Sequence, residues 1–162
     1  MNQEIYLLLG SNLEDRKQWL TWSKNELEKR GWKILSESAI YETEAWGHTD
    51  QNSFLNACIK IEEKDSPFNL LKDIAEIEQL SERQRRQIWG PRQIDIDILF
   101  WGTTTLQSQR LTIPHPLLHT RRFTLVPMVE MAPDLIHPVL KKTMQQLLND
   151  CEDDLNVTIF AE

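Results

Sequence analysis

The segment IDIDILF, residues 94–100, has the pattern of a β-strand with one apolar and one acidic face. Side chains alternate between the faces of a strand, so the isoleucines are predicted to face a core while Asp95 and Asp97 point the other way. Aspartate is unfavourable in strands, which indicates a chemical role for the pair. Two carboxylates about 7 Å apart along a strand can share one divalent cation or flank two. The alternative is an exposed strand face whose acids are incidental.

The rest of the chain predicts further strands and helices. Strands are expected at residues 4–9, 33–43, 54–63 and 94–101, and helices at residues 14–30 and 67–81. The residues between the elements predict a turn at 10–12 and a loop at 44–53. Five prolines between residues 110 and 138 leave room only for short helices there. One more short helix is expected near residues 143–150, before a polar, acidic end.

The order of these elements favours an α+β fold. Strand, helix, strand, strand, helix, strand is the order of a ferredoxin-like sandwich, in which a mainly antiparallel sheet carries helices packed on one face. The length of 162 residues corresponds to one domain, so residues 1–162 are expected to form a single domain.

The composition narrows the class of protein. Eighteen Lys and Arg against 25 Asp and Glu give a formal net charge of −7, which disfavours general binding to nucleic acid. No apolar run approaches the ~20 residues that span a bilayer, and the first residues lack the basic start of a signal peptide. The two cysteines, Cys58 and Cys151, make neither a disulfide framework nor a metal-ligand pattern. We therefore expect a cytoplasmic protein with no membrane partner.

The basic residues are segregated around the two aspartates. Seven of the nine arginines lie between positions 83 and 122, where the only acids are Asp95 and Asp97, so this window carries +5 and the rest of the chain −12. Arginine holds phosphate oxygens through planar, bidentate hydrogen bonds. An arginine-only cluster in an acidic protein predicts a polyanion site, and the alternative is a solvated basic face.

Two further features bear on phosphate binding. His115 lies between two prolines downstream of the aspartates, and it can contact a phosphate, act as an acid, or serve only the structure. Gly10-Ser11-Asn12 follows the first strand but has neither the GxxxxGK[ST] nor the GxGxxG pattern, so a conventional mononucleotide loop is not expected.

Four runs of sequence resemble one enzyme family. They are LLLGSNLEDR, YETEAWGHTDQNSFLNACIKIE, RQRRQIWGPRQIDIDILFWG and LTIPHPLLHTRRFTLVPMVEMAP, spread over roughly residues 5–138. Together they resemble 6-hydroxymethyl-7,8-dihydropterin pyrophosphokinase of the folate pathway, and the WGPRxxDxD and PHPxxxxR segments are highly specific. The resemblance implies the ferredoxin-like fold and the transfer of the β,γ-pyrophosphoryl unit of ATP to the hydroxymethyl oxygen of the pterin, with release of AMP.

The resemblance also implies the residues of a metal and nucleotide site. Asp95 and Asp97 would hold two Mg²⁺ ions. The expected catalytic residues are Arg83, Arg85, Arg92, Asp95, Asp97, His115 and Arg121. The expected nucleotide contacts are Glu78, Arg85, Trp89, Arg92, Arg110, Thr112, His115 and Arg121.

A separate pterin site follows from the same resemblance. Phe54 and Phe123 would sandwich the ring between their aromatic faces, which suits a flat heteroaromatic molecule. The remaining expected pterin contacts are Thr43, Glu44, Trp46 and Asn56.

These observations lead to one principal hypothesis and two alternatives. The principal hypothesis is a monomeric, Mg²⁺-dependent pyrophosphokinase that acts on ATP and 6-hydroxymethyl-7,8-dihydropterin. The first alternative is a weakly active nucleotide- or pterin-binding relative, because Glu82 and Ile88 stand where the family often has Gly and a basic residue. A third departure is Glu44, which stands where the pterin loop of the family often has Pro. The second alternative is a nucleic-acid-binding module, which the acidic net charge opposes. Residues 82–90 are expected to form a lid that becomes ordered when both substrates bind.

Overall fold

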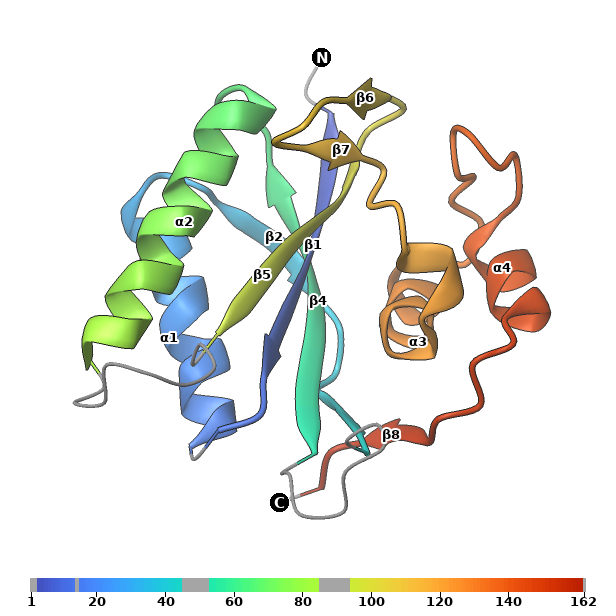
Figure 1. Ribbon diagram of the computed structural model, residues 1–162, viewed down its shortest axis with the longest axis horizontal. Coiled ribbons are helices and arrows are strands. Elements are labelled where there is room, and N and C mark those ends of the chain that lie inside the picture. The colour runs from blue at the N-terminus through green and yellow to red at the C-terminus, as the bar shows by residue number, and fades with distance from the viewer. Residues whose placement is uncertain (1–2, 14, 45–52, 85–93, 162) are drawn as a thin grey trace.

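The computed structural model describes residues 3–13, 15–44, 53–84 and 94–161, without the side chains of residues 83 and 84. In chain order the elements are β1 (Glu4–Ser11), α1 (Arg16–Lys29), β2 (Ile34–Glu37), β3 (Tyr41–Thr43), β4 (Phe54–Glu62), α2 (Pro67–Gln84), β5 (Asp95–Trp101), β6 (Leu106–Gln107), β7 (Thr112–Ile113), a 3-10 helix (Leu118–Thr120), α3 (Arg122–Met131), α4 (Met144–Asp150) and β8 (Val157–Ile159). The main sheet has the order β5-β1-β4-β3-β8, with β2 also paired to β4, and each of these pairings is antiparallel (Figure 1).

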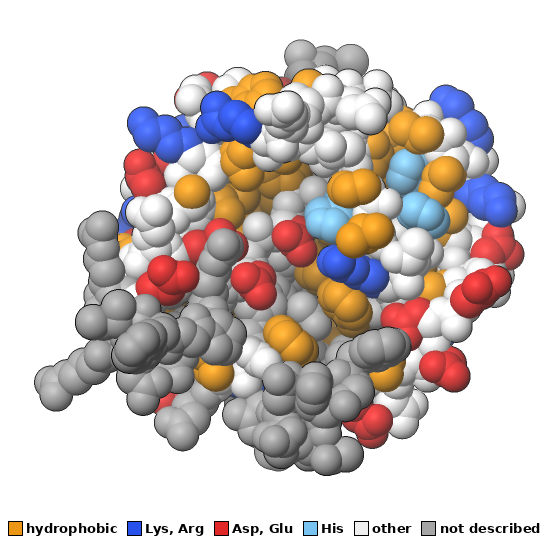
Figure 2. Space-filling model, in the orientation of Figure 1, with side chains coloured by type: hydrophobic (Ala, Val, Ile, Leu, Met, Phe, Trp, Pro, Cys, Tyr) orange, Lys and Arg blue, Asp and Glu red, His pale blue; other side chains and the backbone are white. Residues whose placement is uncertain are grey.

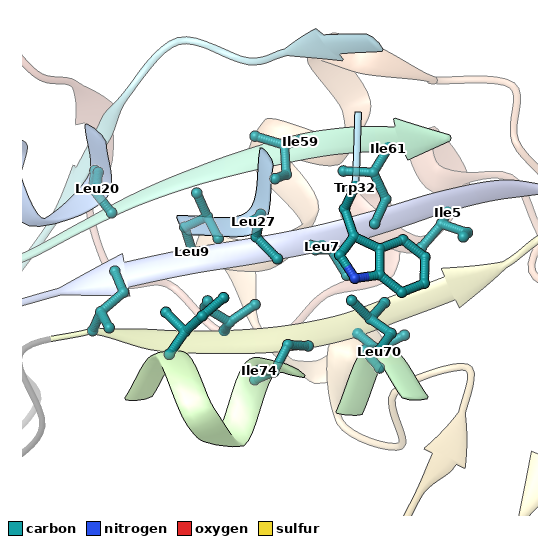
Figure 3. Packing of buried hydrophobic residues seen from close by; sticks show 14 of the residues in the cluster. Ile5, Leu7, Leu9, Leu20, Leu27, Trp32, Ile59, Ile61, Leu70 and Ile74 are labelled. Atoms are coloured by element: carbon teal, nitrogen blue, oxygen red, sulfur yellow. The ribbon is translucent and has the colours of Figure 1, made fainter. Parts of the chain in front are cut away.

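One face of the sheet packs on α1 and α2. Alternate residues of β1 and β4 point to this side, where they meet Leu20 and Leu27 of α1 and Leu70 and Ile74 of α2 (Figure 3). Trp32, which follows α1, is fully buried between the helices and the sheet, and its indole N–H donates to Asp73 Oδ2 at 2.8 Å. The isoleucines of segment 94–100 belong to this core, so the alternation predicted for that strand is confirmed.

The opposite face of the sheet is covered by α3 and α4 (Figure 1). A second cluster there joins Tyr6, Leu8 and Cys58 of the sheet to Leu125 and Met128 of α3, and it extends to α4. The expectation of helices on one face only was therefore wrong. The physical reason is that most residues of β1 and β4 are buried, on both sides of the sheet, and such strands need cover on both faces.

Several element boundaries differ from the predicted ones. The strand expected at 33–43 is two strands, because the Ser38 hydroxyl accepts from Cys58 N at 2.9 Å and interrupts the ladder there. Gly10 and Ser11 belong to β1 and not to a turn. Helix α2 continues to Gln84, three residues further than expected, so residues 82–84 of the predicted lid are helical. Residues 85–90 of that prediction lie outside the described residues. Strand β8, in the acidic end, was not predicted.

The remaining helix predictions are confirmed. Helix α1 lies within 14–30 and α4 within 143–150, and α4 begins with a capping box in which Thr143 and Gln146 exchange hydrogen bonds. The helices of the proline-rich region are short, as predicted, and consist of the 3-10 turn and the ten-residue α3.

Candidate active site

A row of four residues crosses the sheet on the face that α3 covers. Asp95 of β5 is the register partner of Gly10, Gly10 that of Asn56, and Asn56 that of Tyr41. Because side chains alternate, Asp97 points to the same side as Asp95. The sheet register therefore brings the predicted metal ligands and one predicted pterin contact to one face.

A cavity of about 310 Å³, which we call the first cavity, opens on this face. Figure 2 shows acidic side chains around a hollow in the middle of the face, with histidines near one rim. The cavity is lined by Leu8, Gly10, Thr43, Glu44, Phe54, Asn56, Asp95, Asp97, Arg121, Phe123 and Leu155. Five of the six expected pterin contacts are thus brought together, and the sixth, Trp46, lies outside the described residues.

Two buried polar atoms in the first cavity lack a hydrogen-bond partner within the described part of the chain. They are Asn56 Oδ1 and Thr43 Oγ1. Asn56 is held in place from its other end, because Nδ2 donates to Leu9 O at 3.3 Å. A Cβ atom on Gly10 would come within 2.6 Å of Asn56 Nδ2, so only glycine leaves room for this side chain. Buried polar groups normally find partners, so these two atoms are suited to bind a polar ligand edge.

Charged residues lie close to both aromatic residues of the first cavity, at the ring of Phe123 and at the residue before Phe54. The guanidinium carbon of Arg121 lies 5.6 Å from the ring centroid of Phe123, within the range of a cation–π contact. Ser53, which precedes Phe54, donates to Glu42 Oε2 at 2.6 Å and accepts at its carbonyl from Arg16 at 2.7 Å. The hydroxyl of Ser53, together with the charge of Arg16, lowers the pKa of Glu42 against the opposing effect of burial.

A second cavity of about 250 Å³ lies on the other side of Asp97. Its lining includes the expected nucleotide contacts Arg110, Thr112 and His115, and the guanidinium carbon of Arg110 lies 5.7 Å from the ring centroid of Phe68. Asp97 lines both cavities. A group bound to this carboxylate can therefore face ligands in either cavity.

His115 is oriented by backbone contacts toward Asp97. Its Nδ1 accepts a hydrogen bond from Leu117 N at 3.2 Å, and its Nε2 lies 4.0 Å from Asp97 Oδ1. Burial lowers the pKa of His115, Asp97 opposes the change, and Arg121 adds to it. Because Nδ1 accepts from Leu117 N, the proton of the neutral ring lies on Nε2, the nitrogen that faces the aspartate.

The acidic pair suits a magnesium ion that also binds substrate. The described residues contain no group of three or more His, Cys, Asp or Glu that could hold a metal by themselves. Mg²⁺ is commonly bound by one or two carboxylates, with water and phosphate oxygens completing its octahedron. Asp95 and Asp97 supply such carboxylates beside two cavities, so the residues present fit Mg²⁺ bound together with a phosphate ligand.

Some predicted residues are not brought to the cavities. Glu78 is absent from the described lining of both cavities, and its Oε2 accepts from Ile96 N at 3.0 Å. Arg83 lies in the last turn of α2, where only the backbone is described. Besides Trp46, the predicted site residues outside the described part of the chain are Arg85, Trp89 and Arg92.

Sequence reasoning missed three residues that line the first cavity, which are Leu8, Gly10 and Leu155. A glycine inside a strand often marks a close approach of another group, so Gly10 carried a usable signal. Leu8 and Leu155 are ordinary apolar residues, and no local pattern distinguishes them.

Comparison with known proteins gives the following likenesses. The chain matches the family model described as 7,8-dihydro-6-hydroxymethylpterin-pyrophosphokinase (HPPK) over residues 6–133. The Aquifex aeolicus protein named 2-amino-4-hydroxy-6-hydroxymethyldihydropteridine pyrophosphokinase is 37% identical over 142 residues, which cover 88% of this chain and 88% of that protein. The protein of the same name in Methylorubrum extorquens is 41% identical over 132 residues, which cover 81% of this chain and 84% of that protein.

Among solved structures, wild-type Plasmodium falciparum HPPK-DHPS superposes with a TM-score of 0.71 at 16% sequence identity. The superposition covers 93% of this chain and 45% of that one, so this chain spans less than half of that protein. At such low identity the likeness concerns the fold alone, and it confirms the predicted α+β, ferredoxin-like fold.

Proposed function

Because the chain belongs to the 7,8-dihydro-6-hydroxymethylpterin-pyrophosphokinase family, it is an ATP-dependent pyrophosphokinase of folate biosynthesis, and we propose that its two cavities hold the two substrates. The reaction transfers pyrophosphate from ATP to the hydroxymethyl group of 6-hydroxymethyl-7,8-dihydropterin and releases AMP. The observation that carries the assignment of the cavities is that Asp97 lines both of them.

The first cavity is the proposed pterin site. A pterin is a flat ring with N–H donors along one edge, and it needs apolar faces together with a few polar partners. Phe54 and Phe123 supply aromatic surface, and the unpartnered atoms Asn56 Oδ1 and Thr43 Oγ1 supply acceptors for the donor edge. Glu44 adds a carboxylate at the rim, and Trp46 is assigned to this site by its motif alone.

The second cavity is the proposed nucleotide site. Arg110, Thr112 and His115 line it, and a triphosphate that extends from it toward Asp97 would pass the Nε2–H donor of His115. Arg121 lines the first cavity and offers a positive charge near the point of transfer. The assignment of Arg83, Arg85, Trp89 and Arg92 to the same nucleotide rests on their motifs.

Asp95 and Asp97 are the proposed ligands of two Mg²⁺ ions. When bound, Mg²⁺ neutralises phosphate charge and polarises the phosphoryl group that is transferred. The residues of the chain hold the hydroxymethyl oxygen of the pterin near the β-phosphorus of ATP, so that this oxygen forms the new bond and the α,β-bridging oxygen leaves with AMP. Holding the two reactants in line supplies much of the rate in reactions of this kind.

A product analysis tests this function. The purified protein is incubated with ATP, Mg²⁺ and 6-hydroxymethyl-7,8-dihydropterin, and nucleotides are separated by anion-exchange chromatography. AMP is expected to form in a one-to-one ratio with the pterin diphosphate. Tight binding of both substrates in calorimetry without AMP would instead favour the weakly active relative, and ADP would contradict pyrophosphoryl transfer.

We further propose that residues 1–162 act as a single-domain monomer in the cytoplasm. Within the ranges that the structure describes, none of the helices combines the length and the apolar character that crossing a membrane requires. Light scattering coupled to gel filtration tests the monomer, for which the expected mass is that of one 19.1 kDa chain.

A further inference from the structure

The C-terminal segment, residues 152–159, lies beyond the part of the chain that matches the family model, which ends at residue 133. The sequence predicts only a polar, acidic end here. In the structure, Leu155 lines the first cavity together with Thr43 and Phe123. The segment therefore contributes a side chain to a site whose other residues come from the body of the fold.

A single carboxylate holds Leu155 beside helix α3. Asp153 Oδ1 accepts a hydrogen bond from Leu155 N at 3.0 Å, and Asp153 Oδ2 accepts one from Arg122 N at 3.0 Å. Arg122 begins α3, whose own N-cap residue, Arg121, makes no side-chain capping bond. The first N–H groups of a helix lack acceptors within the helix, so Asp153 stabilises the start of α3 from outside it. Phe123 is the next residue of that turn.

Strand β8 holds the same segment to the opposite wall of the cavity. Val157 is the register partner of Thr43 in the antiparallel pairing of β8 with β3. Phe160 N donates to Ile40 O at 2.8 Å, and the guanidinium carbon of Arg16 lies 5.6 Å from the ring centroid of Phe160. In the sequence, Leu155 is midway between two anchors, which are Asp153, bonded to the start of α3, and Val157 of β8, paired with β3. This arrangement holds Leu155 in the lining of the first cavity, which also includes Phe123 and Thr43.

We propose that residues 153–157 form a wall of the pterin-binding cavity, in which Leu155 contacts the substrate and Asp153 positions both Leu155 and Phe123. The proposal rests on the proposed function, because it takes the first cavity as the pterin site. Leu155 has no polar side-chain atom, so it excludes water from an apolar part of the ring while Asn56 satisfies the polar edge. The segment thereby adds to the specificity for a flat heteroaromatic substrate.

Two substitutions at Leu155 test the contact. The dissociation constant of 6-hydroxymethyl-7,8-dihydropterin is measured by calorimetry with Mg²⁺ and a non-hydrolysable ATP analogue present, and that of the analogue is measured separately. Leu155→Ala is expected to raise the pterin Kd about tenfold, since part of a leucine side chain is lost from the contact. Leu155→Met keeps the volume and is expected to restore the Kd close to that of the wild type. The Kd of the ATP analogue is expected to stay unchanged.

Two substitutions at Asp153 test whether this residue positions Leu155 and Phe123. Asp153→Ala removes both acceptors and is expected to raise the pterin KM severalfold with little change in kcat. Asp153→Asn keeps one acceptor oxygen, so its KM is expected to lie between those of Asp153→Ala and the wild type. The neighbouring acid Asp154 is exposed, and Asp154→Asn serves as the matched control with an unchanged KM. If Asp153→Ala does not fold, the two variants at Leu155 decide the question.

Phe123→Ala separates the failure of this proposal from the failure of the proposed function. If Phe123→Ala weakens pterin binding and Leu155→Ala does not, the C-terminal wall is overturned while the cavity assignment stands. If neither variant weakens it, the pterin assignment of the first cavity fails and the wall fails with it. An equal loss of pterin and nucleotide affinity in Leu155→Ala, without recovery in Leu155→Met, also overturns the wall, because it indicates general damage to the fold.

Discussion

Glu78 Oε2 on helix α2 accepts a hydrogen bond from the backbone N–H of Ile96 on strand β5, 3.0 Å away. Ile96 lies between Asp95 and Asp97, so this bond ties the helix to the part of the strand that carries both acids. The resemblance to the pyrophosphokinase family implies that Glu78 lies near the nucleotide. In the structure its carboxylate contacts the backbone between the two acids, and it thereby supports the strand that carries them.

Removing the acceptor at position 78 is therefore expected to affect both stability and turnover. Glu78→Leu leaves Ile96 N–H without its acceptor and is expected to lower the free energy of unfolding by about 1–3 kcal/mol. Its kcat is expected to fall more than its pterin KM rises, since the strand with Asp95 and Asp97 loses support. Glu78→Gln keeps an acceptor oxygen and is the control. Equal losses in urea unfolding and steady-state kinetics for both variants would show that the charge matters and not the bond.

The two phenylalanines are expected to act on the pterin and not on the nucleotide. Phe54→Ala or Phe123→Ala removes stacking of roughly 0.5–1.5 kcal/mol beyond simple burial. Calorimetry is expected to show weaker pterin binding with the affinity for an ATP analogue nearly unchanged. If both proteins simply unfold, or lose the two ligands equally, the residues are ordinary core aromatics.

The aspartates are expected to serve as metal ligands and not as general bases. Asp95→Ala and Asp97→Ala should each lower turnover far more than pterin affinity, because the ring is bound mainly by separate residues of the first cavity. Asp95→Asn is expected to stay inactive when the pH is raised, since a ligand and not a titrating base is lost. Near-normal turnover of Asp97→Ala at ordinary Mg²⁺ concentration would exclude this role.

Gly10 is expected to be required because of Asn56. A Cβ atom at position 10 would lie 2.6 Å from Asn56 Nδ2, so Gly10→Ala should displace that side chain and weaken pterin binding. In an Asn56→Ala background the collision is absent, and the same substitution should cost much less stability. A double-mutant cycle measured by urea unfolding checks this coupling. If Gly10→Ala lowers the free energy of unfolding equally in the wild-type and Asn56→Ala backgrounds, the close approach of residue 10 to Asn56 is unimportant.

Glu26 is expected to make stability depend on pH in the acidic range. Burial raises the pKa of Glu26, but the hydrogen bonds and charges of Lys29 and Arg30 outweigh it and lower the pKa overall. A lowered folded-state pKa gives stability that is present above the unfolded value, about 4.3, and is lost as the pH falls through the folded value. Glu26→Gln should thus destabilise at neutral pH, and its difference from the wild type should shrink in acid.

The neighbouring Glu28 is exposed and provides the control for this measurement. Glu28→Gln should leave the pH dependence of thermal unfolding close to that of the wild type. A constant difference between Glu26→Gln and the wild type from neutral to acidic pH would contradict the ionic origin of the effect.

Local pattern alone determined which residues share a face. The alternation in residues 94–100 placed Asp95 and Asp97 together, because the period of a strand is a property of the backbone and needs no knowledge of its partners. The motifs around them were sufficient to predict the family, and the prolines were sufficient to limit the helices between residues 110 and 138. These are short-range signals, and short-range signals survive in a single sequence.

Tertiary structure alone decided which distant residues meet. The pairing of Gly10 with both Asp95 and Asn56 depends on the register of three strands, and the bond of Asp153 to Arg122 joins residues 31 positions apart in the chain. A glycine inside a strand signals a close approach, but the sequence does not say which residue approaches it. The bond between Asp153 and Arg122 has no sequence signature, because it forms only when the C-terminal segment packs on α3. Contacts of this kind form the first cavity. Its aspartates could be predicted from the sequence because strand alternation is local, but Leu155 could not, because its place depends on the bonds that Asp153 makes.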